Sequence, residues 1–149
     1  MTVLSAQTIR RLGIITPFNE RTVFKGMSYG LSSCGYDIRL KQQWSLFRDE
    51  LALLSSIEHF NMPNNVVGRV CDKSTWARQG ITVQNTIIEP GWRGYLTLEV
   101  HNISRRHRFL PEGVPIAQIV FEFLDEPTEQ LYEGKYQDQP NYPVEAILE

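Results

Sequence analysis

Two carboxylates lie close together in the stretch IIEPGWRGYLTLEVHN, residues 87–102. Pro90-Gly91 is a strong turn signal, and the flanking residues are the β-branched, aromatic and leucine types that fit a half-buried strand. We therefore predict a hairpin-like unit with Glu89 before the turn and Glu99 within the second strand. Side chains alternate along a strand, so Glu99 lies on its more polar face. The apolar face carries Leu96, Leu98 and Val100. Glu99 is either a solvated surface residue or a carboxylate directed into a site.

The segment CDKSTWARQG, residues 71–80, gathers two cations and two hydroxyls within one short turn. These residues are Lys73, Ser74, Thr75 and Arg78. Together with the N–H groups of a turn, they could hold phosphate oxygens or a carboxylate. The alternative is a hydrophilic loop whose hydroxyls bind only the local backbone.

A second basic stretch, SRRHRF at residues 104–109, lies between two predicted strands. It has no aromatic residues interleaved with its arginines, unlike the stacking surfaces that bind single-stranded nucleic acid. We therefore predict a solvated loop tip there.

Two enzyme classes are excluded by their missing motifs. A zinc-dependent nucleobase deaminase needs His-x-Glu and Pro-Cys-x-x-Cys, and neither occurs. The Gly-x-Ser-x-Gly turn of a serine hydrolase is also absent. Any chemistry must therefore use carboxylates, cations and bound water, without zinc.

The 149 residues suit one domain, and the net charge of −2 provides no overall basic field for nucleic acid or an anionic membrane. No apolar run is long enough to span a membrane, and no signal segment opens the chain. We expect a cytoplasmic protein without a membrane or nucleic-acid partner. Cys34 and Cys71 are expected to be reduced packing residues.

The elements that must position Glu89, Glu99 and the cations of residues 71–80 are mostly predicted to be strands. Ser5 and Gly13 have the types that begin and end a short helix. Five β-rich runs follow, separated by Pro, Gly or Asn, and they predict an all-β sandwich or barrel. These runs are residues 34–40, 64–71, 80–88, 94–102 and 115–124. The polar tail from Tyr132 onward, within a C-terminal arm of about residues 126–149, is either disordered or orders on a ligand or neighbouring subunit.

Six segments together resemble the dCTP deaminase branch of the trimeric dUTPase-like superfamily, in the same order along the chain. They are LSAQTIRRL, SSCGYDIRL, MPNNVVGRVCDKSTWARQGI, IIEPGWRGYLTLEVHN, GVPIAQIVF and YEGKYQDQ. The resemblance implies a distorted β-barrel that assembles as a homotrimer with sites between subunits. It also implies a deoxynucleoside triphosphate substrate, dCTP or dUTP, with Mg²⁺ bound to its phosphates.

The resemblance also implies roles for single residues. Glu99 matches the catalytic glutamate, and Arg78 matches the arginine that orients it and stabilises charge developing on the ring. Ser74 matches the serine that helps to position water and base. Glu89 stands for an aspartate near the sugar 3′-hydroxyl, and Trp92 for the aromatic residue that packs on the deoxyribose.

The remaining substrate-binding set rests on the same resemblance. Gln118, Tyr132, Lys135 and Gln139 are similar to the triphosphate-binding residues. Lys73, Thr75, Trp76, Ala77, Thr97 and Leu98 complete the set.

The chain departs from the common bacterial members in three places. Residues 81–87, which supply backbone contacts to the base in that family, are two residues fewer here. The chain is also shorter between residues 40 and 51, and Lys73 replaces an arginine whose bidentate fork lysine cannot copy.

Three functional hypotheses follow. The first is a dCTP deaminase that gives dUTP and ammonia. The second is a bifunctional enzyme that gives dUMP and pyrophosphate, or a plain dUTPase. The third is a nucleotide-sensing trimer without catalysis.

Overall fold

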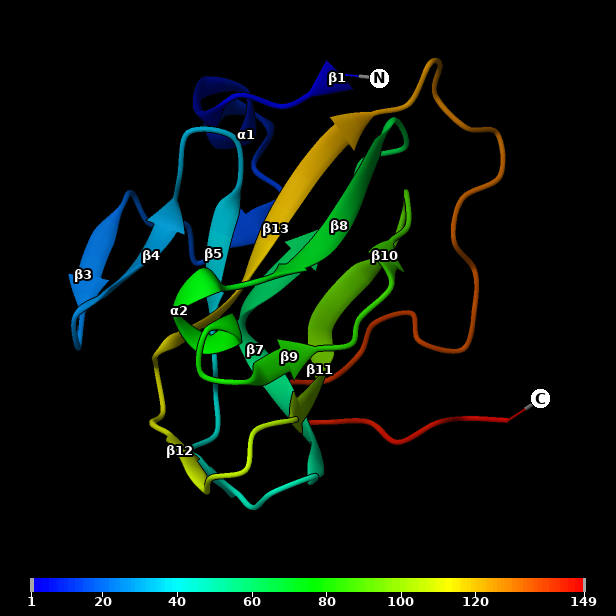
Figure 1. Cartoon of the computed structure of the whole chain (residues 1–149). Coiled ribbons are helices and arrows are strands. Elements are labelled where there is room, and N and C mark those ends of the chain that lie inside the picture. Colours follow the sequence, from blue (N-terminus) through cyan, green and yellow to red (C-terminus); the bar gives the residue numbers. More distant parts are fainter. Residues whose placement is uncertain (1, 149) are drawn as a thin grey trace.

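The computed structural model describes residues 2–148 as short antiparallel strands with two helices (Figure 1). In chain order the elements are β1 (Thr2–Val3), α1 (Ala6–Leu12), β2 (Ile15–Thr16), β3 (Thr22–Phe24), β4 (Met27–Leu31), β5 (Tyr36–Arg39), β6 (Trp44–Leu46), β7 (Leu51–Asn61), β8 (Val66–Asp72), α2 (Ser74–Ala77), β9 (Ile81–Val83), β10 (Ile87–Ile88), β11 (Arg93–Asn102), β12 (Arg108–Leu110) and β13 (Pro115–Phe123). The predicted all-β class is confirmed.

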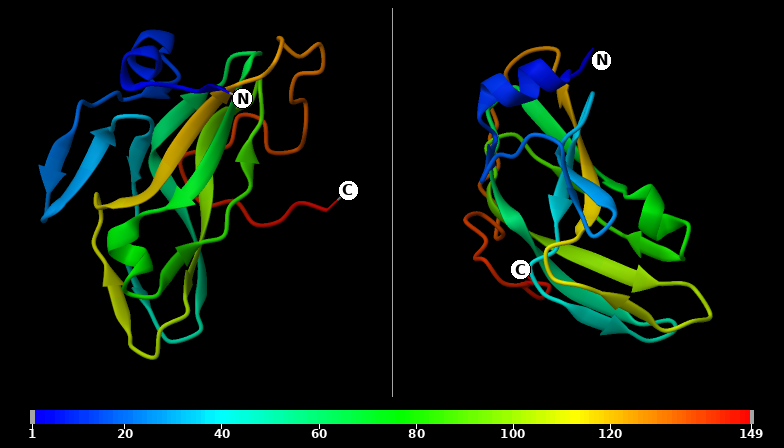
Figure 2. Two further views of the ribbon diagram at one scale, coloured as in Figure 1. Left: turned by 45° about the horizontal axis from the view of Figure 1, so that its top comes forward. Right: turned by 90° about the vertical axis from the view of Figure 1, so that its left-hand side faces the viewer.

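The strands of the described residues form two main sheets that curl around one core. The larger sheet has the order β10-β8-β13-β5-β4-β3, with β1 added on β13, and the smaller has the order β2-β7-β11-β9. Strands β6 and β12 form a separate pair. Figure 2 shows α1 at one end of the molecule and the β6–β12 pair at the other. The result is a distorted barrel.

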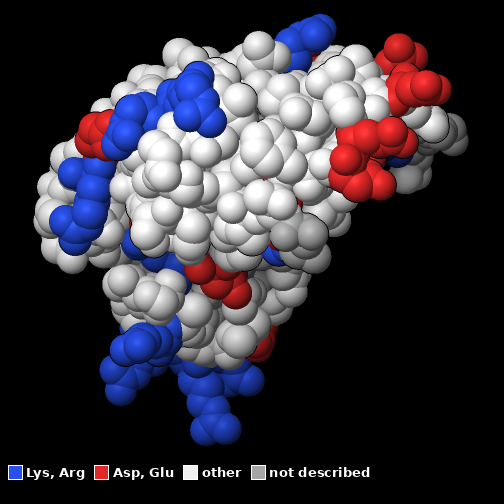
Figure 3. Space-filling model, turned by 90° about the horizontal axis from the view of Figure 1, so that it is seen from above, with Lys and Arg blue, Asp and Glu red and all other residues white. Residues whose placement is uncertain are grey.

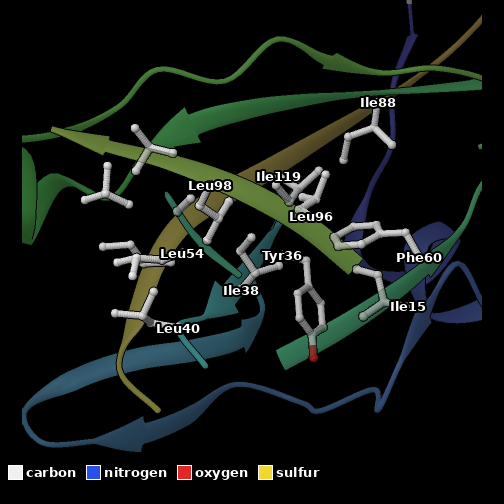
Figure 4. Close-up of a cluster of buried hydrophobic side chains, with 14 of the residues drawn as sticks. Ile15, Tyr36, Ile38, Leu40, Leu54, Phe60, Ile88, Leu96, Leu98 and Ile119 are labelled. Atoms are coloured by element: carbon white, nitrogen blue, oxygen red, sulfur yellow. The ribbon is translucent and has the colours of Figure 1, made fainter. Parts of the chain in front are cut away.

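The core lies between the two sheets and is built from their inward-facing apolar residues (Figure 4). Ile38 and Ile119 come from the larger sheet, whereas Leu54, Phe60 and Leu98 come from the smaller, and all five are at most 1% exposed. Each buried side chain of this size contributes roughly 1.5–3 kcal/mol. The faces that strand alternation makes apolar therefore hold the sheets together.

Helix α1 begins and ends where its sequence signals predict. Ser5 is the N-cap in extended conformation, and Gly13 follows the helix at φ 63°, in the left-handed region that glycine adopts without strain. Ile9 is buried against the barrel.

The predicted hairpin of residues 87–102 is wrong. Strand β10 pairs with β8, where Ile88 lies opposite Gly68, whereas β11 pairs with β7 and β9. The Pro90-Gly91 turn therefore carries the chain from one sheet to the other. The turn is present as predicted, but the choice of partner strand depends on residues far away in the sequence.

A buried ion pair links strands β4, β5 and β7. The Glu58 carboxylate is fully buried and accepts hydrogen bonds from the main-chain N–H and the Nε of Arg39, both over 2.8 Å. The Arg39 guanidinium also lies 4.6 Å from the ring centre of Tyr29. Burial raises the pKa of Glu58, while the hydrogen bonds and charge of Arg39 oppose that shift.

The two cysteines are free thiols. Cys71 is half-buried, but Cys34 is exposed, so the expectation that both are packing residues is wrong for Cys34. No helix among residues 2–148 has the length and apolar character needed to cross a membrane.

Candidate active site

A cavity of about 430 Å³ opens beside strand β11. Its polar lining comes from three parts of the chain: the segment between β9 and β11, strand β11 itself, and the C-terminal tail. The residues that matter for chemistry are Asn85, Glu89, Trp92, Thr97, Glu99 and Gln139. The cavity thus gathers several of the residues expected to bind a nucleotide.

Glu99 is the half-buried carboxylate of this cavity. Its Oε2 is buried and has no hydrogen-bond partner among the described residues. Burial raises the pKa of Glu99, opposed by a hydrogen bond from its own N–H. None of the described residues lining the cavity is Lys, Arg or His. A carboxylate that is desolvated but open to a cavity has the properties of a general base.

The alternation predicted for β11 is confirmed, with one addition. Leu96, Leu98 and Val100 are buried, while Glu99 is half-exposed. Thr97 is buried as well, because the tail covers it. The Leu98 side chain, which was expected in the substrate-binding set, lies wholly in the core.

Asn85 is a cavity residue that sequence reasoning missed. Its Nδ2 donates to the carbonyl of Thr97 over 2.8 Å, and its Oδ1 accepts from the N–H of Glu99 over 3.2 Å. The only sequence signal was its position in the shortened segment 81–87.

Trp92 and Glu89 lie on either side of the Pro90-Gly91 turn and both line the cavity. Trp92 is buried, packs against Phe60 at a ring-centre distance of 6.3 Å, and donates its Nε1 hydrogen to the carbonyl of Tyr136 over 2.7 Å. Glu89 is exposed at the rim. A flat aromatic wall and a free carboxylate therefore stand at the same edge.

The C-terminal tail runs back along the barrel of its own chain (Figure 1). Its residues form one wall of the cavity. Gln139 pairs with Gly94, and its carbonyl accepts from the N–H of Tyr95 over 3.1 Å. A Cβ on Gly94 would lie 2.6 Å from the nitrogen of Gln139, so only glycine allows this approach. In this structure the tail thus has a defined path along the barrel of its own chain.

Two tail residues of the predicted triphosphate set differ in position. Tyr132 lines the cavity. Lys135 is exposed, with its Nζ 5.5 Å from the ring centre of Tyr136, and does not line the cavity.

The basic segment after β8 forms the single-turn helix α2 rather than a loop. Ser74, Thr75, Ala77 and Arg78 are exposed there. Trp76 is buried and donates to the carbonyl of Pro115 over 2.8 Å, which makes it a packing residue. None of these residues lines the cavity.

Lys73 is already paired in this chain. Its Nζ lies 3.1 Å from Oδ2 of Asp37, and both side chains are largely buried. Gln118 lies opposite Asp37 in the sheet and donates to the hydroxyl of Ser32 over 3.2 Å, so this polar side chain has a partner within its own chain. Lys73 and Gln118 belong with α2, outside the cavity.

The predicted site residues therefore form two groups within one chain. The cavity group comprises Glu89, Trp92, Thr97, Glu99, Tyr132 and Gln139. The helix group comprises Lys73, Ser74, Thr75 and Arg78, with Gln118 nearby. One copy of the chain does not bring Arg78 or Ser74 to Glu99.

Positive and negative side chains form separate groups on the surface. On the face shown in Figure 3, Lys and Arg side chains gather in places apart from the main group of acids.

In the loop of residues 104–109, Arg105 and Arg106 are exposed as predicted. Phe47 from the β6–β7 turn lies beside this loop, and the centre of its ring is 5.1 Å from the centre of the His107 ring. Among residues 2–148, no three His, Cys, Asp or Glu side chains are placed to hold a metal ion.

Comparison of the sequence with known families supports one assignment. Residues 35–124 match the family described as dCTP deaminase-like. A dCTP deaminase from Gemmatimonas aurantiaca is 36% identical, with 93% of each chain covered. One from Campylobacter concisus is 34% identical over 185 positions, covering 99% of this chain and 100% of that relative. The alignment is longer than the 149 residues of this chain, so the relative contains segments that are missing here.

Comparison with solved structures supports the fold. The EIAV dUTPase aligns with a TM-score of 0.61 at 19% identity, covering 82% of this chain and 97% of the other. The 2′-deoxycytidine 5′-triphosphate deaminase from Agrobacterium tumefaciens aligns with a TM-score of 0.66 at 17% identity, covering 80% and 47%. These neighbours have the expected dUTPase-like architecture. Taken with the family match and the identities to curated relatives, they place this chain in the dCTP deaminase family.

Proposed function

We propose that the protein hydrolyses the 4-amino group of dCTP to give dUTP and ammonia. The observation that carries this proposal is the Glu99 carboxylate, which is half-buried, has an unpartnered oxygen and faces the cavity of a dCTP deaminase family member. The substrate is a free deoxynucleotide, which is consistent with a cytoplasmic enzyme.

The chemistry requires a group that first accepts a proton and then returns it. As water attacks C4 of cytosine, Glu99 takes its proton. Glu99 then returns this proton to the 4-amino group, the bond between C4 and that nitrogen breaks, and ammonia leaves. The remaining proton of the attacking hydroxyl moves to N3, so that the ring keeps the oxygen as the C4 carbonyl of uracil. Because burial raises the pKa of Glu99, its carboxylate is a stronger base than a solvated one. A positioned group of this kind contributes on the order of 10²–10⁴ in rate.

We infer that a second copy of the chain completes the site. Within one chain, Oε2 of Glu99 has no hydrogen-bond partner, and the described residues lining the cavity include no Lys, Arg or His. A neighbouring chain can therefore supply a cation and a hydroxyl beside Glu99. Arg78 and Ser74 are exposed on α2, where a neighbour's cavity can reach them. A homotrimer with three shared sites fits this arrangement, because a head-to-tail interface closes into a ring.

The cavity suits a deoxynucleotide. Trp92 offers a flat apolar wall for the sugar, while Gln139 and Tyr132 provide polar groups from the tail for the triphosphate. Lys135, exposed on the same tail outside the cavity, provides a positive charge for phosphates that extend beyond the cavity. Phosphate oxygens are ligands that Mg²⁺ prefers, so the ion would arrive with the substrate and neutralise part of its charge. Of the described cavity residues, Glu89 has the exposed carboxylate that suits such an ion.

The test is to incubate the protein with dCTP, and separately with dUTP, in the presence of Mg²⁺ and to measure ammonia and pyrophosphate. We expect ammonia from dCTP and no pyrophosphate from either nucleotide. Glu99→Gln should lower the rate by at least ~10² while dCTP still binds, because glutamine cannot accept the proton. Glu112→Gln, at an exposed turn, is the matched control and should behave like the wild type. Absence of ammonia, or release of pyrophosphate, would contradict the proposal.

A further inference from the structure

On one edge of strand β11, the pairing with β9 ends beside Glu99. Strand β9 pairs with β11 only from Asn102 to Val100, and the last backbone bond runs from the N–H of Gln84 to the carbonyl of Glu99 over 2.8 Å. The chain then leaves toward β10, which belongs to the other sheet. The N–H of Glu99 and the carbonyl of Thr97 therefore face a gap in the ladder.

The carboxamide of Asn85 fills this gap. It donates to the carbonyl of Thr97 over 2.8 Å and accepts from the N–H of Glu99 over 3.2 Å. A carboxamide has one carbonyl and one N–H₂ group, so this side chain can replace the peptide groups of a missing strand residue. Both Asn85 and Glu99 line the cavity.

The position of Glu99 depends on both edges of β11. On the other edge, Glu99 pairs with Leu53 of β7. The Glu99 carboxyl itself is not held, because its Oε2 has no partner. Its direction is therefore set by its backbone, which is clamped between β7 and the Asn85 side chain.

We propose that Asn85 is a positioning residue for Glu99, holding the backbone of β11 so that this carboxylate points into the cavity during deamination. The inference rests on the proposed function, but its structural part can be tested without turnover. Loss of the carboxamide opens the ladder to water at Glu99. The carboxylate then samples directions that do not face the substrate, whereas the tail that contacts the triphosphate stays in place. Turnover should therefore fall more than substrate affinity.

The first test compares Asn85→Ala with the wild type. We expect kcat to fall by about 10–100-fold, since small misplacements of a reacting group have effects of this size, with KM changed less than about threefold. Exchange of the Glu99 amide hydrogen, followed by NMR, should become at least about tenfold faster, while amides bonded between β11 and β7 keep their protection. Asn64→Ala, which changes an exposed asparagine before β8, is the control and should leave kcat and the exchange rates unaltered.

A second variant, Asn85→Asp, keeps the size of the side chain. It therefore tests the role of Asn85 even if Asn85→Ala fails to fold. Aspartate still accepts from the Glu99 N–H, but it cannot donate to Thr97 and it places a negative charge beside Glu99. The other described titratable groups lining the cavity are Glu89, Tyr132 and Tyr136, which this change leaves intact. We expect the low-pH limb of the kcat profile to move to higher pH, because the added charge disfavours ionisation of Glu99.

Failure of this inference is distinguishable from failure of the proposed function. If the wild-type protein releases no ammonia from dCTP, the proposed function is wrong, and the exchange rate of the Glu99 amide still decides the role of Asn85 in the ladder. If the wild type is active and both variants keep its kcat, its pH profile and a protected Glu99 amide, the positioning role is overturned. A fall in stability alone, with kcat unchanged, would also overturn it.

Discussion

The hydroxyl of Thr97 donates a hydrogen bond to Oε1 of Gln139 over 2.8 Å, which ties the tail directly to the strand that carries Glu99. The same hydroxyl oxygen accepts from the N–H of Val144 over 3.0 Å. One buried side chain therefore connects two points of the tail to the cavity.

Truncation before Tyr132 should leave the barrel folded and weaken dCTP binding. The tail has no strand among its described residues and adds little to the core, but it supplies Tyr132, Gln139 and the charge of Lys135. A charge-assisted contact is worth roughly 1.5–3 kcal/mol, which corresponds to about a tenfold to 150-fold rise in Kd. Circular dichroism and dCTP titration would measure the two effects. An unfolded truncated protein would show instead that the tail is structural.

Mixing two inactive variants should restore activity. In a trimer that combines Glu99→Gln with Arg78→Ala subunits, some interfaces join an intact Arg78 to an intact Glu99. Random mixing at equal amounts should give about a quarter of wild-type turnover if each site combines two adjacent subunits. The measurement is ammonia release after co-expression or joint refolding, with each variant alone as its control. No recovery in verified mixed trimers would mean that the two residues do not act across an interface.

Glu99→Gln should raise the melting temperature at neutral pH. Burial raises the pKa of Glu99 above its ordinary value of 4.5, so the folded state binds this proton more tightly than the unfolded state. The associated stability is fully present below pH 4.5 and is lost as pH rises through the folded-state pKa. Glutamine remains neutral and avoids this loss. The gain should disappear when melting curves are measured near pH 4, and a constant gain at every pH would argue against a charge effect.

Glu58→Ala should destabilise the fold by about 3–5 kcal/mol, because it removes one partner of a buried ion pair and leaves Arg39 uncompensated. Urea unfolding would measure this change. Glu20→Ala is the matched control, since Glu20 pairs with Arg10 on the surface and its loss should hardly shift the unfolding midpoint. Equal effects of the two variants would show that burial of the Glu58 pair is not what matters.

Features that depend on local pattern could be predicted from the sequence. The helix between Ser5 and Gly13, the β class and the alternation around Glu99 all follow from capping residues and a period of two. Resemblance to a family, rather than pattern, identified Glu99 as more than a solvated strand residue.

Features that depend on distant partners could not be predicted. Strand β7 places the polar residues Ser55, Ser56 and Glu58 in the interior, so its sequence does not stand out as a buried strand. The pairing of β10 with β8 rather than β11 depends on the whole sheet. The bridging role of Asn85 requires knowing where β9 ends.

The Pro90-Gly91 turn, which passes from one sheet to the other, has a consequence for how the cavity could change in evolution. Glu89 follows a strand of the larger sheet and Trp92 precedes a strand of the smaller, so these two cavity residues are carried by separate layers. The spacing of those layers is set by closely packed interior side chains such as Phe60, which touches Trp92. Substitutions deep in the interior, which never meet a nucleotide, can therefore widen or narrow the entrance and so alter which pyrimidines are admitted.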